Sequence, residues 1–409
     1  MNKSLMVFFL LTSTLMAQER VLVTPSVSFG RGWNPGTISS EIGDDESPDM
    51  MNMINDFYGM NTQRNGSKRY ISQALSTHPV TSMFMAYAST ETNVMKALIV
   101  SNRNSVYRSS GGVNPIWSVV SSSFDTNTNW EYEMYANEVI MVDSNLRQNI
   151  KRFNVITSSF TDFLSSTPTV RIRAKHLVNS RDQLIVGNIV ELSTHGELTQ
   201  STTYYPSRFR FTDVLTSSFS RNWFIDFNSG DGEQINAVTV KEKLVHVWKE
   251  TKIGELDYNI LAPTAEGGVW TFDTKINGFG LYAPKTLANT GDYYIFGAKD
   301  GIRIWDGGTK TRFQVEQESK VISQPIETLI RRLIKAGTYR NAVGFWYPKK
   351  KWYVFSYEDP ERFPRGANNS TLVFDFVSLS WFPIDGLDAA SFVSQDGIGD
   401  NGEILYGGS

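Results

Sequence analysis

The amino-acid sequence predicts an all-β protein, a β-propeller of six or seven irregular blades with an N-terminal arm and one inserted amphipathic helix. Short apolar strand cores recur about six times at intervals of 42 to 61 residues, the spacing expected of four-stranded blades. The 25 Phe, 17 Tyr and 10 Trp suit half-buried strands, and the 31 Gly suit many turns. Each unit is expected to open with its core and to continue, after a polar turn, into a second strand. The cores are at 97–100, 139–142, 184–186, 245–247, 294–296 and 353–355.

The composition of the whole chain narrows the classes of function. The 409 residues suffice for one closed ring of blades, and the net charge of −3 gives no global field that would gather nucleic acid or an anionic membrane. Because the chain has no cysteine, disulfides, thiolate catalysis and cysteine-based zinc or iron–sulfur sites are excluded.

The first 17 residues have the layout of a secretory signal peptide. Lys3 precedes an apolar run over 5–15, and Ala17 offers a small residue for cleavage. The run is too short to span a bilayer comfortably. Two interpretations stay open: export with cleavage after Ala17, or translation that begins at Met16, which would make the preceding residues an upstream extension.

Residues 18–75 do not fit the repeat and are predicted to form the N-terminal arm. A strand is expected at 21–23, followed by a glycine-containing loop and an acidic segment over 43–53. Asn65 and Gly66 form a pair that is typical of a tight hairpin turn. The propeller is expected to occupy 76–409.

Two places in the repeat are irregular. The largest gap between cores leaves room for a long loop around 193–220, interpreted as an ordinary excursion between strands or as a binding surface. Residues 402–409 are typical of a strand followed by the start of a turn. The last hairpin therefore closes the ring or is cut short, and the choice between six and seven blades stays open.

One segment, at about 324–336, has the pattern of an amphipathic helix. Its apolar residues fall at positions i, i+3, i+4, i+7 and i+8 from Ile326 onwards. Ser323 is expected to be the N-cap, Pro325 fits the first turn, and Gly337 fits the C-terminal cap. The apolar stripe is expected to pack on the ring or to contribute to a subunit contact.

The residues that might support chemistry do not form a catalytic pattern. None of the four histidines has metal-ligand spacing, and alternation within the strand 244–248 indicates a structural role for His246. The acidic segment 226–233 is oxygen-rich but lacks the spacing of a calcium loop, so a turn is preferred. We find no nucleophile elbow, P-loop or dinucleotide fingerprint. The sequence therefore predicts no enzyme activity, no cofactor and no metal site.

Two stretches resemble a known family. The first lies in the arm and includes 47–49, Asn52, Gly59 and 64–69. The second comprises 278–287, with 294–296, 300–302 and 305–307 following before the helix. Together they resemble the β-propeller tail proteins of short-tailed bacteriophages, known as tail nozzle, tail tubular protein B or head–tail stabilisation proteins. The resemblance covers most of the chain from about residue 28.

The resemblance implies a virion structural protein of the bacteriophage tail. Such a protein forms a homo-oligomeric ring, typically a hexamer, below the portal and adaptor proteins of the head–tail connector. The ring is part of the channel through which double-stranded DNA leaves the capsid, without sequence-specific binding and without a membrane partner. The protein would be located in the virion tail after assembly in the host cytoplasm.

Subunit contacts are expected to involve charged and polar residues of the arm and the helix. The acidic cluster of the arm would supply negative charge to a contact or to a channel wall. The residues of this hypothesis are Asp44, Asp45, Glu46, Asp49, Asn52, Arg64, Arg69, Arg331 and Arg332.

The rival interpretation takes the N-terminal signal as genuine. The protein would then be an exported β-propeller, periplasmic or secreted, that acts as a ligand-binding module or as a glycan-active enzyme.

Overall fold

The structure is a computed structural model of the whole chain. It describes residues 31–35, 45–55, 61–63, 71, 73, 75, 78–91, 94–109, 115–122, 124, 128–163, 171–195, 199–258, 270–307, 320–363, 366–395 and 404–408. The signal-like segment 1–17, the strand expected at 21–23 and the turn expected at Asn65 and Gly66 lie outside these residues.

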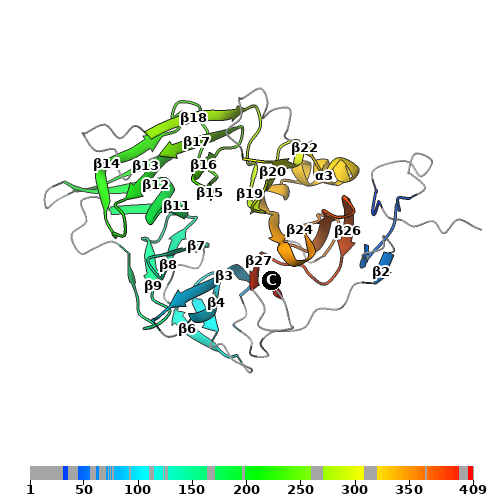
Figure 1. Cartoon of the computed structure of the whole chain (residues 1–409), viewed down its shortest axis with the longest axis horizontal. Coiled ribbons are helices and arrows are strands. Elements are labelled where there is room, and N and C mark those ends of the chain that lie inside the picture. The colour runs from blue at the N-terminus through cyan, green and yellow to red at the C-terminus, as the bar shows by residue number, and fades with distance from the viewer. Residues whose placement is uncertain are drawn as a thin grey trace, which may run out of the picture.

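The protein is an all-β propeller in which six four-stranded antiparallel sheets are arranged around a common centre (Figure 1). Consecutive strands are neighbours in every sheet, so each blade is a simple meander. Blade one consists of β3 (Val80–Ser89), β4 (Val94–Asn102), β5 (Val106–Ser109) and β6 (Trp117–Ser121). Blade two consists of β7 (Trp130–Tyr135), β8 (Glu138–Asp143), β9 (Lys151–Phe153) and β10 (Phe160–Asp162). Blade three consists of β11 (Arg171–Ser180), β12 (Gln183–His195), β13 (Thr199–Thr212) and β14 (Phe219–Asp226).

Blades four to six follow in the same way around the ring. Blade four consists of β15 (Ala237–Lys241), β16 (Leu244–Trp248), β17 (Lys252–Tyr258) and β18 (Trp270–Asn277). Blade five consists of β19 (Ala283–Asn289), β20 (Tyr294–Ala298), β21 (Gly301–Trp305) and β22 (Lys320–Val321). Blade six consists of β23 (Val343–Tyr347), β24 (Trp352–Tyr357), β25 (Ser370–Asp375) and β26 (Ser380–Ile384).

A two-stranded hairpin occupies a seventh place in the ring. It consists of β27 (Ser391–Gln395) and β28 (Ile404–Gly408). Figure 1 shows β27 between the sixth blade and β3, and the backbone N–H of Met83 donates to Ser391 Oγ at 3.0 Å. The ring is therefore closed by six full blades and one short hairpin.

The predicted strand cores are all present, but the expectation that each unit opens with its core is wrong. The cores form β4, β8, β12, β16, β20 and β24, the second strand of each blade. A second strand has partners along both edges and neighbouring blades over both faces, so its sequence is continuously apolar. The first strand lines the centre of the ring and is more polar, as Glu131 and Lys175 illustrate.

The core is divided into layers between adjacent blades, because successive side chains of a strand point to opposite faces. On β7, Trp130 and Tyr132 pack with Ala86 and Ile99 of the first blade. Tyr135 packs on the other face of β7, within the apolar layer shared with the third blade. Each blade is therefore held by both of its neighbours.

The expectation of a long loop around 193–220 is wrong, because most of this segment belongs to the strands β12, β13 and β14. The extended hairpin is braced at its base by Arg208. The guanidinium carbon of Arg208 lies 3.8 Å from the ring centroids of both Tyr205 and Phe224, and Nε and Nη2 donate to Asp226 at 2.7 and 2.8 Å. Burial by itself would lower the pKa of Arg208, but the hydrogen bonds with Asp226 and Glu191 raise it.

The predicted helix forms as α3 (Glu327–Ala336), preceded by the 3-10 turn η2 (Gln324–Ile326). Its apolar side packs on the fifth and sixth blades, where Leu329, Ile330 and Leu333 are buried. Gly337 is the left-handed C-terminal cap, as expected. The expectation for Ser323 is wrong, because its hydroxyl accepts the N–H of Ile302 instead of capping the helix. Two further 3-10 turns are η3 (Tyr339–Asn341) and η4 (Pro348–Lys350).

The described part of the arm lies along the outer strand of the sixth blade. Gly32 forms a parallel β-bridge with Trp381, and the N–H of Trp33 donates to the Trp381 carbonyl at 2.8 Å. Asn52 accepts the N–H of Asp385 at 2.8 Å. A small sheet of β1 (Met53–Asn55) and β2 (Asn61–Gln63) follows. In the described part of the chain, no helix has the length and apolar character needed to cross a membrane.

Candidate functional site: the central cavity and the polar clusters of the blades

A central cavity of about 830 Å³ lies where the first strands of the blades meet. Every first strand, from β3 to β23, contributes to its wall, and β27 contributes as well. The wall includes amide, hydroxyl and charged side chains among its apolar ones. A cavity of this size accommodates a small molecule.

Glu131, His176 and Lys285 are among the titratable residues that line the cavity. His176 Nδ1 lies 2.9 Å from Glu131 Oε2, and the backbone N–H of Leu177 donates to the same carboxylate at 3.3 Å. Lys285, from β19, directs Nζ across the ring to Asn129 Oδ1 at 3.4 Å and to the carbonyl of Thr81 at 3.5 Å. The surrounding protein lowers the pKa of Lys285 because it removes solvent from the ammonium group.

A second carboxyl group, Glu133, lies two residues further along β7. Burial raises its pKa to about 7, a hydrogen bond from the N–H of Met134 lowers it, and the charge of Glu131 raises it further. Two neighbouring carboxyl groups are a common arrangement in acid–base catalysis. Glu133 is not among the residues that line the cavity, so the two carboxyl groups do not converge on it.

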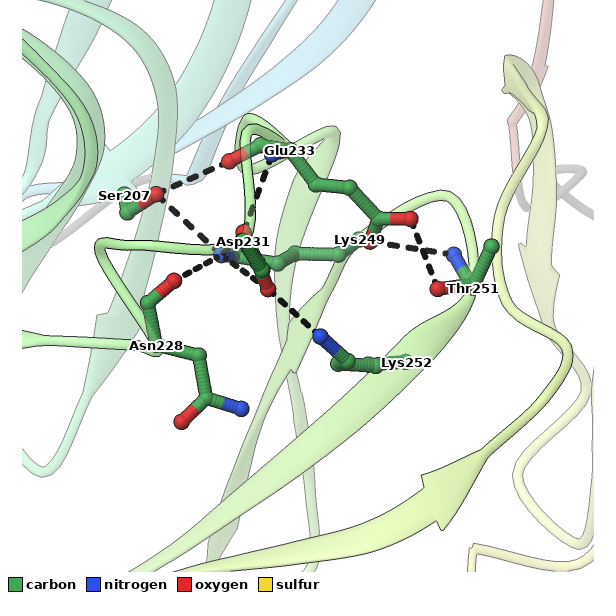
Figure 2. Close-up of polar contacts among 7 residues, drawn as sticks. All are labelled: Ser207, Asn228, Asp231, Glu233, Lys249, Thr251 and Lys252. Atoms are coloured by element: carbon green, nitrogen blue, oxygen red, sulfur yellow. Dashed lines mark hydrogen bonds and ion pairs between the residues drawn. The ribbon is translucent and has the colours of Figure 1, made fainter.

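The acidic segment 226–233 is a turn, as the sequence indicates, and its charge is neutralised by lysines of the same blade. Figure 2 shows Lys249 entering this turn, where Nζ donates to Asp231 Oδ1 at 2.8 Å and to Oδ2 at 3.0 Å. Ser207 Oγ and the carbonyl of Asn228 complete its surroundings at 3.1 and 3.2 Å. The side chain of Lys249 is fully buried.

Further contacts fix the turn. Lys252 Nζ reaches Asp231 Oδ2 at 2.7 Å, and Thr251 Oγ1 donates to Glu233 at 2.6 Å (Figure 2). Burial by itself would raise the pKa of Asp231, but the hydrogen bonds from Lys249 and Lys252 outweigh it and lower the pKa. This cluster is a structural clasp at the start of the fourth blade.

His246 also has a structural role. It is fully buried, and its Nδ1 lies 3.1 Å from the hydroxyl of Tyr294 in the next blade. Its Nε2 lies 3.5 Å from Glu255, which pairs with Lys275 at 3.2 Å. The network joins the fourth and fifth blades. Among the residues that the structure describes, no three His, Asp or Glu side chains are placed to hold a metal ion.

The residues predicted for subunit contacts lie in two separate places. In the arm, Asp45 pairs with Arg31 at 3.1 Å and Glu46 accepts Asn34 Nδ2 at 2.8 Å. Asn52 binds the sixth blade, and Asp49 is exposed. The remaining predicted residues of the arm, Asp44, Arg64 and Arg69, lie outside the described part of the chain.

The two predicted arginines of the helix differ from one another. Arg331 is exposed and pairs with Glu327 one turn earlier at 2.5 Å. Arg332 pairs within the sixth blade, with Asp359 at 3.1 Å and with Glu361 at 2.6 Å. Arg332 therefore anchors the helix to its own ring, whereas Arg331 faces outward.

The sequence did not reveal the cavity residues. Lys285 lies within the stretch 278–287 that carries the resemblance, but Glu131, His176 and Lys175 had no motif. The order of the strands could have identified them, because the polar residues that face the centre of a propeller lie in the strand before each apolar core.

Comparisons with known proteins find no matching family model and no matching curated protein. Among solved structures, the "Crystal Structure of Mitotic Checkpoint Complex" matches with a TM-score of 0.43 and 12% identity, over 85% of this chain and 99% of that chain. The Pan2 WD40 domain of Neurospora crassa matches with a TM-score of 0.43 and 8% identity, over 80% of this chain and 86% of that chain. Raptor of Chaetomium thermophilum matches with a TM-score of 0.40 and 9% identity, over 69% of this chain and 24% of that chain. Similarities at this level say nothing about activity or partners.

Proposed function

We propose that this chain is a structural protein of a bacteriophage tail. In this proposal it is a subunit of a nozzle or stabilisation ring, a hexamer as is typical of the family it resembles, that lies below the portal and adaptor. The observation that carries the proposal is the resemblance of the arm and of 278–287, together with the place of both segments at joints of the scaffold.

Both segments connect parts of the molecule. The arm binds the outer strand β26 through Gly32 and Asn52, so a segment outside the repeat covers the rim of the sixth blade. The stretch 278–287 leads from β18 to β19 and therefore joins the fourth and fifth blades. Segments that fix joints suit a subunit that must stay rigid within an assembly.

The polar clusters favour a scaffold over a catalyst. Lys249 and Asp231 fix a turn, His246 links two blades, and Arg332 holds the helix. Each of these groups satisfies the charge or the hydrogen-bonding needs of another buried group. A subunit built in this way presents a fixed surface to its neighbours.

In this proposal DNA passes between copies of the chain and not through one propeller. Lys285 crosses the central cavity from β19 to the carbonyl of Thr81 on β3. The cavity of about 830 Å³ is far smaller than a duplex requires. A channel for double-stranded DNA therefore needs several subunits around it, and weak contacts with its backbone would permit transit.

The test is the oligomeric state of the purified full chain, measured by sedimentation velocity and by negative-stain microscopy. Sixfold rings with a central opening are expected. A triple charge reversal, D45K with E46K and D49K, is expected to weaken ring assembly, while the matched reversal E242K in the exposed β15–β16 turn leaves it intact. Monomers under all conditions, or equal effects of both variants, would contradict the proposal.

The central cavity favours a second candidate function, an exported propeller that binds a small ligand or acts on glycans. The pair of Glu131 and His176 faces the cavity and provides an acid–base couple. Intact-mass measurement of the native protein separates the candidates. A start at Met16 supports cytoplasmic production and the tail proposal, whereas cleavage after Ala17 supports export.

A further inference from the structure

One mouth of the central cavity collects cationic side chains from the first three blades and from β19. In an antiparallel blade, the turn between the second and third strands returns to the end at which the first strand begins. Arg103 and Arg147 lie in such turns, β4–β5 and β8–β9. Arg173, Lys175 and Lys285 lie near the starts of the first strands β11 and β19. All five therefore belong to the same end of the ring, which we call the basic mouth.

A hollow of about 480 Å³ opens at the basic mouth. Its lining consists of Thr81, Arg103, Thr128, Asn129, Asn145 and Arg147. Thr81 and Asn129 also line the central cavity, and these are the two residues that Lys285 contacts. The hollow thus leads past two arginines to the ammonium group of Lys285.

Among the residues that the structure describes, none of the five cations of the basic mouth forms an ion pair. Three of them donate to neutral groups: Arg173 Nε to Asn149 Oδ1 at 3.3 Å, Lys175 Nζ to Gln234 Oε1 at 3.0 Å, and Lys285 Nζ to Asn129 Oδ1 and the carbonyl of Thr81. Five positive charges are therefore gathered without a neutralising partner in the described chain.

The opposite half of the same end is different, because its cations are paired. Lys249 pairs with Asp231, Arg340 pairs with Glu250 at 2.5 Å, and Arg332 pairs with Asp359. These three cations of the fourth to sixth blades are therefore neutralised, in contrast to the five cations of the basic mouth.

Two carboxylates near the basic mouth, Glu131 and Asp143, are already occupied by other groups. Glu131 is bonded to His176 and to the N–H of Leu177. Asp143 is fully buried and accepts backbone N–H groups of Asn129, Asn145, Arg147 and Gln148 at 3.0 to 3.3 Å. Glu358 also lines the central cavity, and these three carboxylates are still fewer than the five cations. Burial lowers the pKa of both Lys175 and Lys285, and a bound anion would offset this loss of solvent.

We propose that the basic mouth binds a small polyanion that carries two or more phosphate or carboxylate groups. The guanidinium groups of Arg103 and Arg147 suit the planar oxygens of such groups, and Lys285 meets the innermost one. The amide and hydroxyl groups of Asn129, Asn145 and Thr128 supply neutral hydrogen bonds. The reach of Lys285 across the ring limits the ligand to a short one that enters from the mouth.

The test is isothermal titration of the full chain at low ionic strength, with inorganic tripolyphosphate as the phosphate probe and citrate as the carboxylate probe. Saturable one-to-one binding of at least one probe is expected. R147Q and K285M are each expected to weaken it by about tenfold or more, because each removes a direct charge contact. The matched control K243Q removes an exposed lysine from the β15–β16 turn and is expected to change the affinity less than about twofold.

Three outcomes would overturn the proposal. Flat titrations with both probes would show that the basic mouth has no site, and equal weakening by K243Q would show a nonspecific effect of charge. Displacement of the probes by a short duplex DNA, with comparable affinity, would assign the surface to a nucleic-acid backbone instead. Thermal melting of each variant without ligand checks its fold, and R147Q on a surface turn keeps the test decisive if K285M does not fold.

Discussion

Lys249 binds both carboxylate oxygens of Asp231 from inside the protein, at 2.8 and 3.0 Å, with its side chain fully buried. Asp231 also binds Lys252, which is partly exposed. One carboxylate is thus held by an inner and an outer lysine, and the two can be distinguished by mutation.

We expect K249M to lower the free energy of unfolding by about 3 kcal/mol, because buried acceptors lose their donor. K252M should cost no more than about 1 kcal/mol, since its contact is partly exposed to solvent. Urea denaturation at neutral pH measures both values. Equal losses for the two variants would contradict the assignment of Lys249 as the inner clasp.

Gly280 is predicted to be irreplaceable by alanine. A Cβ at this position would clash with the carbonyl of Lys249 and would lie 2.8 Å from the backbone nitrogen of Lys252. Backbone atoms cannot move aside cheaply, so G280A should destabilise the protein by about 1–3 kcal/mol or more. G230A is the matched control, because a Cβ there would meet nothing within 4 Å. Similar thermal stability of G280A and the unmodified protein would refute the prediction.

Glu133 should make the stability depend on pH. Its pKa is raised to about 7, chiefly by burial, above the value of about 4.3 in an unfolded chain. Between these values the folded state keeps the proton and the unfolded state loses it, so stability falls as the pH rises from about 4 to about 7.

E133Q should remove this slope and should be more stable than the unmodified protein above pH 7, by at most about 3 kcal/mol. Urea midpoints at pH 5, 6, 7 and 8 measure the difference. E242Q, in an exposed turn, is the control and should follow the unmodified protein. Parallel pH curves for E133Q and the unmodified protein would count against a buried, protonated Glu133.

Arg208 should not tolerate replacement by lysine. R208K keeps the charge but loses both the bidentate contact with Asp226 and the stacking between Tyr205 and Phe224. We expect a loss of about 1–2 kcal/mol. R331K, on the exposed side of α3, should change stability by less than about 0.5 kcal/mol. Chemical denaturation distinguishes the two, and an equally small effect of R208K would exclude a bracing role.

The sequence allowed prediction of the elements whose signal is local. The cores at 97–100 and 353–355 are apolar because second strands are buried on every side, and the helix has its own period and its cap at Gly337. The role of Ser323 was not predictable, because the N–H of Ile302 that it serves comes from a different strand.

The cavity and the clasp depend on contacts between distant residues. Nothing in the local sequence of Lys285 indicates Thr81, which lies 204 positions earlier. The turn at 226–233 was predictable from its glycines and acidic residues. Its partner Lys249 was not, because Lys249 belongs to the following hairpin. Spatial neighbours of this kind follow only from the closure of the ring.

Closure of the ring joins residues that are synthesised early to residues that are synthesised late. Met83 meets Ser391 across 308 positions, and Asn52 meets Asp385 across 333. A nascent chain therefore exposes its first blade on one side until residues 385–391 have left the ribosome. A product that stops before residue 385 lacks both of these contacts, and we expect it to remain an open array that proteases cleave more readily.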